Sequence, residues 1–377
     1  MSYYLSLDEV RQRAAEATNI VAVVVRMLGD AVIATPSLDA VKRWKPDARL
    51  TVVIGQRIAP LFEHHPSIDS LIVVRDRPAW RHKAAAMREI ASRQFDLALN
   101  FHGGPTSGWY AWAVNGPRIG IDGYSMYLIH HHLADVAQHW PGRSPIEGAL
   151  EGNPLHKVEY RFTVARAAGV PGEPGPLSVP IPDDAKQRVA DRLAADGVEP
   201  GSLVVVQPTA TAPPKQWATA RFADLCEHIA RQGLELVITT GPGEDAVFER
   251  LRGFVPDRIR LLHYSSLPLP EFAALASFAR IYAGNDTGPS HIAAAAGCPC
   301  LVMFGPIPTS TWRPWGVPHR AVSVRAWCSP CNFHKTCPRD EGPHPHCIAN
   351  ITTDMVRAAF DELLAATAST VLNAQSS

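Results

Sequence analysis

The chain has 377 residues, with 36 basic and 36 acidic side chains and a hydrophobic fraction of 46 %. This length exceeds that of an ordinary domain with a single hydrophobic core, so two domains are expected. The balanced charge argues against a general nucleic-acid-binding protein, and no apolar run reaches the roughly 20 residues needed to span a bilayer. The first 19 residues contain acidic side chains from Asp8 onward and lack the apolar stretch of a signal peptide. We therefore expect a cytoplasmic protein whose seven cysteines form no structural disulfides.

Apolar runs that are typical of buried strands alternate with helical patterns in the first half of the chain. Strands are predicted at residues 19–25, 49–55, 69–74 and 95–101, and helices at residues such as 31–44 and 82–93. Repeated alternation of strand and helix predicts a parallel sheet covered by helices on both faces.

A segment rich in proline and glycine, residues 169–184, interrupts this alternation, which then restarts. Further strands are predicted at residues 202–208, 234–240, 258–264, 279–285 and 298–304. The predicted class is therefore α/β, with two Rossmann-like doubly wound domains facing across a cleft. Ligands of such sheets bind beyond the carboxyl ends of the strands. The predicted divisions are an N-terminal extension (1–18), a first domain (19–180) and a second domain (181–377).

The stretch GNDTGPSHIAAAAGCPCLVMFGP, residues 284–306, follows one of these predicted strands. Pro289 suits the first position of a helix, which makes Gly288 the predicted N-cap. The amides of Ser290 and His291 would then face a phosphate group. Asp286 cannot attract an anion, but it can orient the turn or accept hydrogen bonds from a sugar. The alternative is a capping aspartate followed by a histidine that packs in the core.

Other nucleotide-binding loops are absent from the sequence: there is no P-loop, and no G-x-G-x-x-G follows the first strand. Residues 284–306 resemble the donor-site signature of glycosyltransferase family 9, the heptosyltransferases of lipopolysaccharide assembly. VVVRMLGDAVIATPSLDAVKRWKPDARLTVVIG (23–55), FDLALNFHGG (95–104) and PRIGI (117–121) are also similar to that family. The resemblance runs from about residue 19 to about residue 365. It implies a GT-B fold, an acceptor-binding first domain, a nucleotide-sugar-binding second domain and inverting transfer without a catalytic metal ion.

Two residues are candidates for the chemistry of glycosyl transfer, which needs a base and a group that stabilises the departing diphosphate. Asp30 lies where the chain passes from the first predicted strand into a helix, a place where an aspartate is also an ordinary N-cap. The resemblance assigns it the role of base. Lys215 lies in a loop after the strand at 202–208, where an ammonium suits a diphosphate. The family has a similar Thr-rich loop with Lys-x-Trp, matched here by Lys215 and Trp217.

The remaining donor-site candidates also follow predicted strands. Glu244 lies at the predicted start of a helix, where the helix dipole alone favours a glutamate. The resemblance suggests in addition that Glu244 contacts the nucleoside ribose. The resemblance places the 284–306 motif against the sugar and diphosphate. The predicted donor-binding residues are Thr209, Thr211, Glu244, Asp286, Thr287, Gly288 and His291.

Residues 75–93 carry six arginine or lysine side chains against two acidic ones. Such a run is usually a solvated helix face. In the family this region is a basic element near an anionic acceptor, which makes Arg77, Arg81 and Lys83 the predicted acceptor-binding residues.

A cysteine-rich segment spans residues 328–347, with three histidines between its thiols. A C-x2-C pair followed by two further thiols is suitable spacing for tetrahedral zinc or iron. The alternative is a loop of reduced cysteines. The predicted ligands of a structural metal are Cys328, Cys331, Cys337 and Cys347; no cofactor is expected for catalysis.

The leading hypothesis is an inverting glycosyltransferase that uses a nucleotide-activated heptose, with ADP-heptose as the expected donor. The acceptor is left open between an anionic glycolipid such as a lipopolysaccharide core, a protein and a small molecule. A GT-B sugar-nucleotide epimerase and a non-catalytic binding protein are the alternatives. Expected partners exclude nucleic acid and include at most peripheral membrane contact, and homo-oligomer formation is left open.

Overall fold

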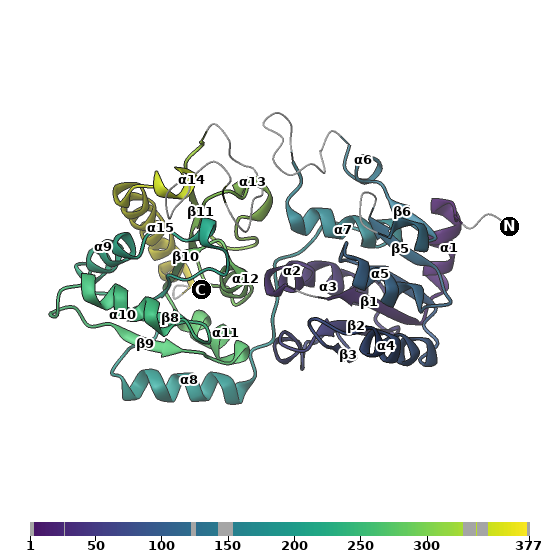
Figure 1. Ribbon diagram of the computed structural model, residues 1–377, viewed down its shortest axis with the longest axis horizontal. Coiled ribbons are helices and arrows are strands. Elements are labelled where there is room, and N and C mark those ends of the chain that lie inside the picture. Colours follow the sequence, from purple (N-terminus) through teal and green to yellow (C-terminus); the bar gives the residue numbers. More distant parts are fainter. Residues whose placement is uncertain are drawn as a thin grey trace. The chain divides into compact units, whose positions relative to one another are not determined.

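A computed structural model of the chain describes residues 4–25, 27–121, 126–141, 154–326, 337 and 346–374. The contacts among the described residues define two compact units. Unit 1 holds the described residues up to 180, and unit 2 begins at Ile181. Each unit contains one six-stranded parallel sheet (Figure 1), which confirms the predicted α/β class.

The sheet of unit 1 has the strand order β3-β2-β1-β4-β5-β6. Helices cover both of its faces: α4 and α5 pack on one, and α3 and α7 pack on the other. The strands are β1 (Asn19–Val24), β2 (Arg49–Gly55), β3 (Ser70–Val74), β4 (Leu97–Asn100), β5 (Arg118–Ile121) and β6 (His132–Ala134). The helices are α1 (Leu7–Glu16), α2 (Leu28–Ile33), α3 (Thr35–Trp44), η1 (Ala59–Leu61), α4 (Trp80–Ser92), α5 (Pro105–Trp112), η2 (Tyr127–Ile129), α6 (Val136–His139) and α7 (Lys157–Ala167).

The sheet of unit 2 has the order β12-β11-β10-β7-β8-β9. Helices α8, α11 and α12 cover one face, and α9, α10 and α15 cover the other. The strands are β7 (Leu203–Gln207), β8 (Glu235–Thr240), β9 (Leu262–Ser265), β10 (Ile281–Asn285), β11 (Cys300–Phe304) and β12 (His319–Ser323). The helices are α8 (Asp183–Ala195), η3 (Pro213–Lys215), α9 (Thr219–Ala230), α10 (Asp245–Phe254), α11 (Leu269–Phe278), α12 (Gly288–Ala295), α13 (Thr309–Trp312), α14 (His346–Ala349) and α15 (Thr353–Ala374).

Both sheets have the same topology, with their first and fourth strands adjacent at the centre. β1 pairs with β4 in unit 1, and β7 pairs with β10 in unit 2. The chain leaves these two central strands in opposite directions, which opens a crevice beyond their carboxyl ends. Each unit therefore has one preferred place for a ligand, beside the residues that follow its first and fourth strands.

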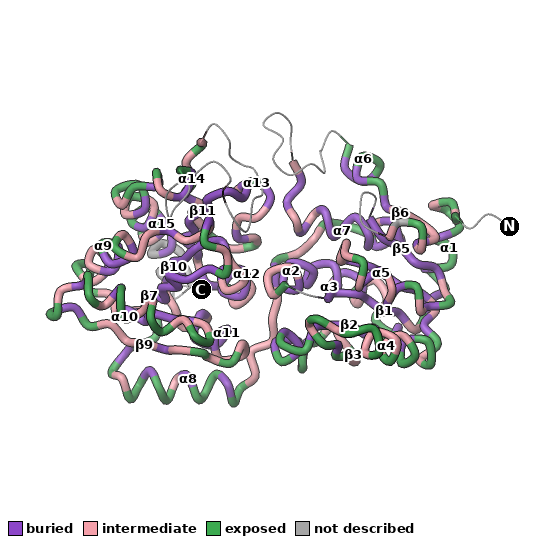
Figure 2. The backbone as a smooth tube through the Cα atoms, in the orientation of Figure 1, coloured by how far each residue is buried: buried purple, intermediate pink, exposed green. Residues whose placement is uncertain are grey.

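The cores form because the central strands are apolar on both faces. From Ile20 onward every residue of β1 is buried, as is every residue of β7, β10 and β11. In Figure 2 the buried segments of each unit are concentrated on its strands, and the exposed ones on the outer sides of its helices. Burying both faces of a sheet in this way is what parallel strands require.

The prediction of a single helix at 31–44 was wrong, because this segment contains two helices, α2 and α3, that meet at Ala34. Pro36 lies in the first turn of α3, where a missing N–H is tolerated, whereas inside a continuous helix it would break the backbone hydrogen bonds. The break leaves α2 as a separate short helix directly after β1.

The N-terminal extension forms α1, which belongs to unit 1 and packs against α7. Ser6 and Glu9 form a capping box at its start, and Val10 and Ala14 are fully buried. Among the described residues, no helix combines the length and the apolar composition that crossing a membrane requires.

Candidate active site

The turn after β10 is the start of the candidate donor site. Asp286 is buried, and its amide donates to the carbonyl of Met303 on β11 at 3.1 Å. The N-cap of α12 is Thr287, not Gly288 as predicted. The prediction that the Ser290 amide is free was also wrong. This amide donates to the carbonyl of Thr287 at 3.1 Å, because the first turn of α12 is tightened, as helix ends often are.

Two other amides replace it as donors at this helix end. Within the described residues, the backbone amides of Thr287 and Gly288 have no hydrogen-bond acceptor. Both lie at the positive end of α12, beyond the carboxyl edge of the sheet. An anion at this position would meet unsatisfied N–H groups.

Lys215 and Asp286 form an ion pair in the same crevice. Lys215 ends η3 in the loop after β7, and its Nζ lies 2.7 Å from Oδ2 of Asp286. The carboxylate side chain is 4 % exposed and the lysine side chain 18 % exposed. The sequence therefore predicted both residues, but not their contact. Asp286 neutralises and orients an ammonium that keeps a surface toward solvent, and an ammonium has further N–H donors for an anion.

Asn285, which the sequence analysis missed, joins the loop after β7 to the end of β10. Its side chain is fully buried. Oδ1 accepts a hydrogen bond from the amide of Trp217 at 3.0 Å, and Nδ2 donates to the carbonyl of Pro208 at 3.0 Å. Trp217 is also buried and donates its indole N–H to the carbonyl of Ile351. These bonds fix both ends of the loop that carries Lys215.

Glycines at two motif positions allow close backbone approaches around this loop. A Cβ at Gly284 would lie 2.9 Å from the carbonyl oxygen of Gln207 on β7. A Cβ at Gly305, just after β11, would lie 2.8 Å from the carbonyl oxygen of Pro214. Any side chain at residue 305 would therefore displace the turn that positions Lys215.

The two threonines predicted at the donor site differ in exposure. Thr209 is buried, and its hydroxyl accepts a hydrogen bond from Gln207 Nε2 at 2.6 Å. Thr211 is exposed in the loop that follows. Gln207 also accepts from Thr239 on the neighbouring strand, so Thr209 belongs to a buried polar network at the end of β7.

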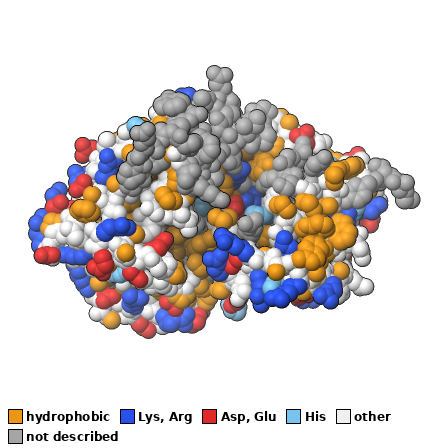
Figure 3. Space-filling view, viewed as in Figure 1, with side chains coloured by type: hydrophobic (Ala, Val, Ile, Leu, Met, Phe, Trp, Pro, Cys, Tyr) orange, Lys and Arg blue, Asp and Glu red, His pale blue; other side chains and the backbone are white. Residues whose placement is uncertain are grey.

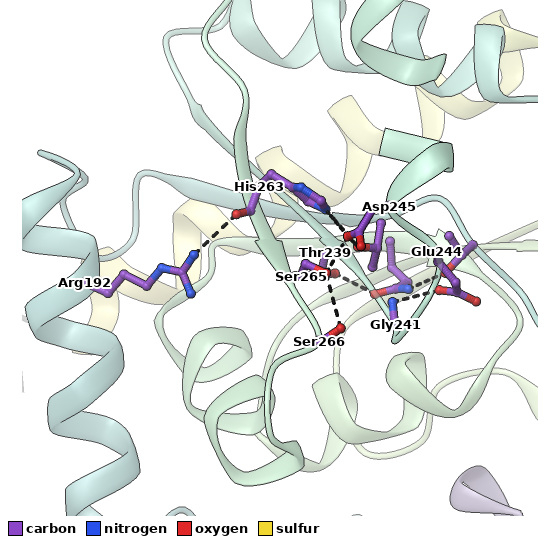
Figure 4. Close-up of polar contacts among 11 residues, drawn as sticks. Arg192, Thr239, Gly241, Glu244, Asp245, His263, Ser265 and Ser266 are labelled. Atoms are coloured by element: carbon purple, nitrogen blue, oxygen red, sulfur yellow. Dashed lines mark hydrogen bonds and ion pairs between the residues drawn. The ribbon is translucent and has the colours of Figure 1, made fainter. Parts of the chain in front are cut away.

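Glu244 lies at the N-cap position of α10, after β8. Its Oε2 accepts a hydrogen bond from the amide of Gly241 at 2.8 Å, which closes the turn (Figure 4). The neighbouring Asp245 accepts from Ser265 Oγ at 2.5 Å. Its carboxylate also lies 3.7 Å from Nε2 of His263, whose pKa is lowered by burial. Both carboxylates thus order the carboxyl edge of β8 and β9.

Asp30 makes the corresponding contact in unit 1. It lies in the first turn of α2, just beyond β1, and its Oδ1 accepts from Arg161 Nη2 at 2.5 Å. Arg161 also donates to the carbonyl of Phe101, which follows β4. The arginine side chain is 5 % exposed and that of Asp30 is 17 % exposed. Asp30 is therefore held at the crevice of unit 1 by an arginine that the sequence analysis missed.

His291 is buried in α12, where its ring lies tilted to that of Trp312 with 6.2 Å between centroids.

The predicted acceptor-binding residues lie in unit 1, away from the residues that follow its central strands. Arg77 and Arg81 are exposed and Lys83 is half-buried, before and within α4. They follow the edge strand β3, and no contact between them and Asp30 is found among the described residues.

Two of the four predicted metal ligands, Cys328 and Cys331, lie outside the described residues. Cys337 is partly exposed, and Cys347 is buried in α14. Among the described residues, no cluster of three or more His, Cys, Asp or Glu side chains could hold a metal ion. Burial raises the pKa of Cys298, in the donor motif, to about 12, so this thiol stays protonated at neutral pH and is no thiolate ligand.

Solved structures with the same architecture identify the class of fold. The chain is similar to a glycosyl transferase family 9 structure from Veillonella parvula, with a TM-score of 0.75 and 18 % identity, covering 96 % of this chain and 99 % of that one. It is also similar to the Escherichia coli ADP-heptose lipopolysaccharide heptosyltransferase II, with a TM-score of 0.73 and 15 % identity, covering 92 % of this chain and 98 % of that one. The fold is that of a GT-B glycosyltransferase, as predicted.

The sequence itself defines the family. Residues 83–341 match the family model for glycosyltransferase family 9 (heptosyltransferase), and the chain belongs to this family. It is 27 % identical over 302 residues to lipopolysaccharide heptosyltransferase 3 of Escherichia coli, covering 77 % of this chain and 84 % of that protein. The predicted family and the predicted enzyme class, a glycosyltransferase, are both confirmed.

Proposed function

We propose that this glycosyltransferase moves a heptosyl group from ADP-heptose to a hydroxyl of a lipopolysaccharide core, with inversion at the anomeric carbon. The observation that carries the proposal is the Lys215–Asp286 ion pair beside the free amides of Thr287 and Gly288. In a member of a heptosyltransferase family, this arrangement suits the diphosphate of a sugar nucleotide. The names of the relatives support ADP-heptose as the donor and lipopolysaccharide as the acceptor.

Unit 2 supplies the charge stabilisation in the proposed reaction. The bond from the anomeric carbon to the diphosphate oxygen breaks, and ADP leaves with the bonding electron pair. The ammonium of Lys215 and the two amides meet the charge that develops on the leaving oxygen. Because Asp286 holds the ammonium beforehand, little reorganisation is needed when that charge appears. Glu244, Thr211 and His291 are proposed to contact the rest of the donor.

Unit 1 supplies the base. The acceptor oxygen forms the new bond to the anomeric carbon and gives its proton to the carboxylate of Asp30. Arg161 keeps one carboxylate oxygen engaged, which fixes the direction of the other. Because the leaving group is stabilised by protein groups in this mechanism, turnover should not require an added divalent cation.

Donor specificity can be tested without knowing the acceptor. We expect ADP and ADP-heptose to raise the melting temperature more than UDP, GDP or their hexose conjugates. At 100 times its dissociation constant a ligand adds about 2.7 kcal/mol to the free energy of unfolding. At about 2–4 °C per kcal/mol for a domain of this size, the melting temperature rises by about 5–11 °C.

Transfer is then measured as ADP release with ADP-heptose and three acceptor classes: heptose-deficient lipopolysaccharide, protein and a small-molecule polyol. Release that depends on lipopolysaccharide, with an anomeric configuration opposite to the donor's by NMR, supports the proposal. Free or isomerised sugar without an acceptor would instead indicate an epimerase. Complete loss of turnover in EDTA, restored by Mg²⁺, would contradict the role given to Lys215.

A further inference from the structure

Unit 1 contains a cavity of about 580 Å³ where the C-terminal end of α7 meets α1 and α6. Sites that bind small molecules commonly have about 300–1,000 Å³, so this volume suits an organic ligand. The cavity is lined by Arg11 on α1, by Gln138 and His139 on α6, by Arg166 on α7, and by the loop 169–173.

This cavity is separate from the crevice of unit 1 in which Asp30 lies. Arg161, which binds Asp30, and Arg166 are both on α7, five residues apart. Five residues are about 7.5 Å along a helix and about 140° around it. The two arginines therefore serve different sites, and a ligand in the cavity leaves the proposed acceptor position free.

Arg166 is held in a fixed orientation at the cavity. Its Cζ lies 3.8 Å from the ring centroid of Trp140, and its Nη1 donates to the carbonyl of His139 at 2.8 Å. Its Nη2 binds the carboxylate of Glu173, whose side chain is 70 % exposed. An ion pair that is open to solvent contributes little stability. Glu173 is therefore an exchangeable anion on a guanidinium group that is already ordered.

Two further groups at the cavity lack a partner. Arg11 is exposed, and no carboxylate in the described part of the chain pairs with it. His139 is 9 % exposed, and its Nε2 is buried without a hydrogen-bond partner among the described residues. A buried polar atom with no partner indicates a missing ligand or water. Burial, and then positive charges of which Arg11 contributes most, lower the pKa of His139 to about 4, so the surrounding potential is positive.

The donors around the cavity suit a phosphate group better than a carboxylate. They are the guanidinium groups on α1 and α7 and the backbone amides of Gly172 and Glu173, which have no acceptor within the described residues. A phosphate monoester has three terminal oxygens, so it can accept from more of these donors than a carboxylate, which has two. A bare phosphate would leave most of the volume empty, and Val170 and Pro171 supply apolar surface for an organic body.

We propose that this cavity binds a phosphorylated small molecule, such as a sugar phosphate, with its phosphate group between the guanidinium groups of Arg11 and Arg166. The phosphate takes the place of the Glu173 carboxylate on Arg166 and pairs the charge of Arg11. The site shares no residue with the proposed donor site around Lys215, which is in unit 2. Its test needs neither donor nor acceptor, so the proposal can fail independently of the proposed function.

The test is titration calorimetry of the full chain with glucose 6-phosphate, inorganic phosphate, gluconate and glucose. Glucose 6-phosphate should bind and inorganic phosphate should compete with it, whereas gluconate should bind at least about tenfold more weakly and glucose not at all. Arg11→Gln should weaken the binding of glucose 6-phosphate at least about tenfold, because a charge-assisted hydrogen bond is lost. Glu173→Gln should instead tighten it about two- to fivefold, since a competing carboxylate is removed.

Matched controls separate this site from a general attraction of anions to basic surfaces. Arg13 is exposed on α1, like Arg11, but it does not line the cavity. Arg88 is exposed on α4, over which Figure 3 shows lysine and arginine side chains gathered. Arg13→Gln and Arg88→Gln should each change the affinity for glucose 6-phosphate less than about twofold, because exposed charges at a distance are screened by salt.

Three results would overturn the proposal. The first is no binding of glucose 6-phosphate or inorganic phosphate up to about 10 mM. The second is equal affinity in the wild type, Arg11→Gln and Arg13→Gln. The third is binding that is lost in Lys215→Met but kept in Arg11→Gln, which would assign it to unit 2. Gluconate bound as tightly as glucose 6-phosphate would contradict the assignment of a phosphate.

Discussion

Replacing Asp30 by asparagine separates catalysis from stability. The substitution keeps the shape of the side chain and one acceptor oxygen, but it removes the charge that faces Arg161. Since that arginine side chain is only 5 % exposed, losing a charge-assisted bond should cost about 1.5–3 kcal/mol. At about 2–4 °C per kcal/mol, the melting temperature falls by about 3–12 °C. Turnover should fall far more, by about 10²–10⁴, because the base is lost.

A second aspartate of unit 1 provides the control. Asp39 on α3 has the same side-chain exposure as Asp30, 17 %. It accepts hydrogen bonds from Ser67 Oγ at 2.5 Å and Ser178 Oγ at 2.6 Å. Asp39→Asn should lower the melting temperature without changing turnover, since the contacts of Asp39 are with Ser67, Ser178 and His65 and not with Asp30 or Arg161. ADP release at saturating donor and acceptor measures turnover, and titration calorimetry with ADP checks that donor binding is intact.

The comparison of the two variants decides the role of Asp30. Turnover above about a tenth of the wild-type value in folded Asp30→Asn would refute the assignment of the base. Equal losses of turnover in Asp30→Asn and Asp39→Asn would mean that both act through the stability of unit 1. Retained ADP affinity together with lost turnover in Asp30→Asn alone is the expected result.

Three further predictions concern other parts of the chain. Lys215→Met leaves the buried Asp286 carboxylate unpaired, which should cost about 3–5 kcal/mol. Adding Asp286→Asn should restore the melting temperature but not ADP affinity; restored affinity would contradict the diphosphate role. Elemental analysis of untagged protein should find one zinc or iron per chain, and its absence would leave residues 328–347 as a loop of reduced thiols. Burial and then the charge of Arg11 lower the pKa of His139 from 6.5 to about 4. The unfolded state therefore takes up more protons in this window, and the free energy of unfolding should fall as the pH drops from 6.5 to about 4. His139→Gln should flatten that dependence in urea titrations.

The sequence predicts the long buried strands well because their apolar runs have few alternatives. It misses β5, β6 and β12, which have three to five residues each. β12, for example, reads HRAVS and is mostly half-buried. β6 and β12 are edge strands, whose conformation depends on the neighbouring strand that local sequence does not reveal. β5 is buried between β4 and β6, and its four residues are too short a run to be distinguished by pattern. The predicted strand at 258–264 begins at Leu262 instead, where its pairing with β8 starts. The arginines before it use their side chains for other contacts: Arg258 pairs with Glu227, and Arg260 donates to the carbonyl of Asp196.

Candidate site residues were predictable where they directly follow a strand. Asp30, Lys215, Glu244 and Asp286 all do so, and parallel topology brings the carboxyl ends of central strands together. Arg161 was not predictable in this way. It lies in the middle of α7, and 131 residues separate it from the aspartate that it binds. The one local signal is an arginine within a helix whose other residues are largely buried, which indicates a buried partner without naming it.

The contact at Gly305 bears on how this enzyme could be engineered or could diverge. The turn that holds Lys215 follows β7, yet its position depends on residue 305, just after β11, being a glycine. A Cβ at residue 305 would lie 2.8 Å from the Pro214 carbonyl oxygen. Libraries that vary the loop after β7 to change donor choice should therefore keep residue 305 as glycine, or vary both segments together. Thr211 is exposed and carries no such constraint. Within the proposed donor site, Thr211 is therefore the position to vary first, while residue 305 stays a glycine as long as the Pro214 carbonyl keeps its place.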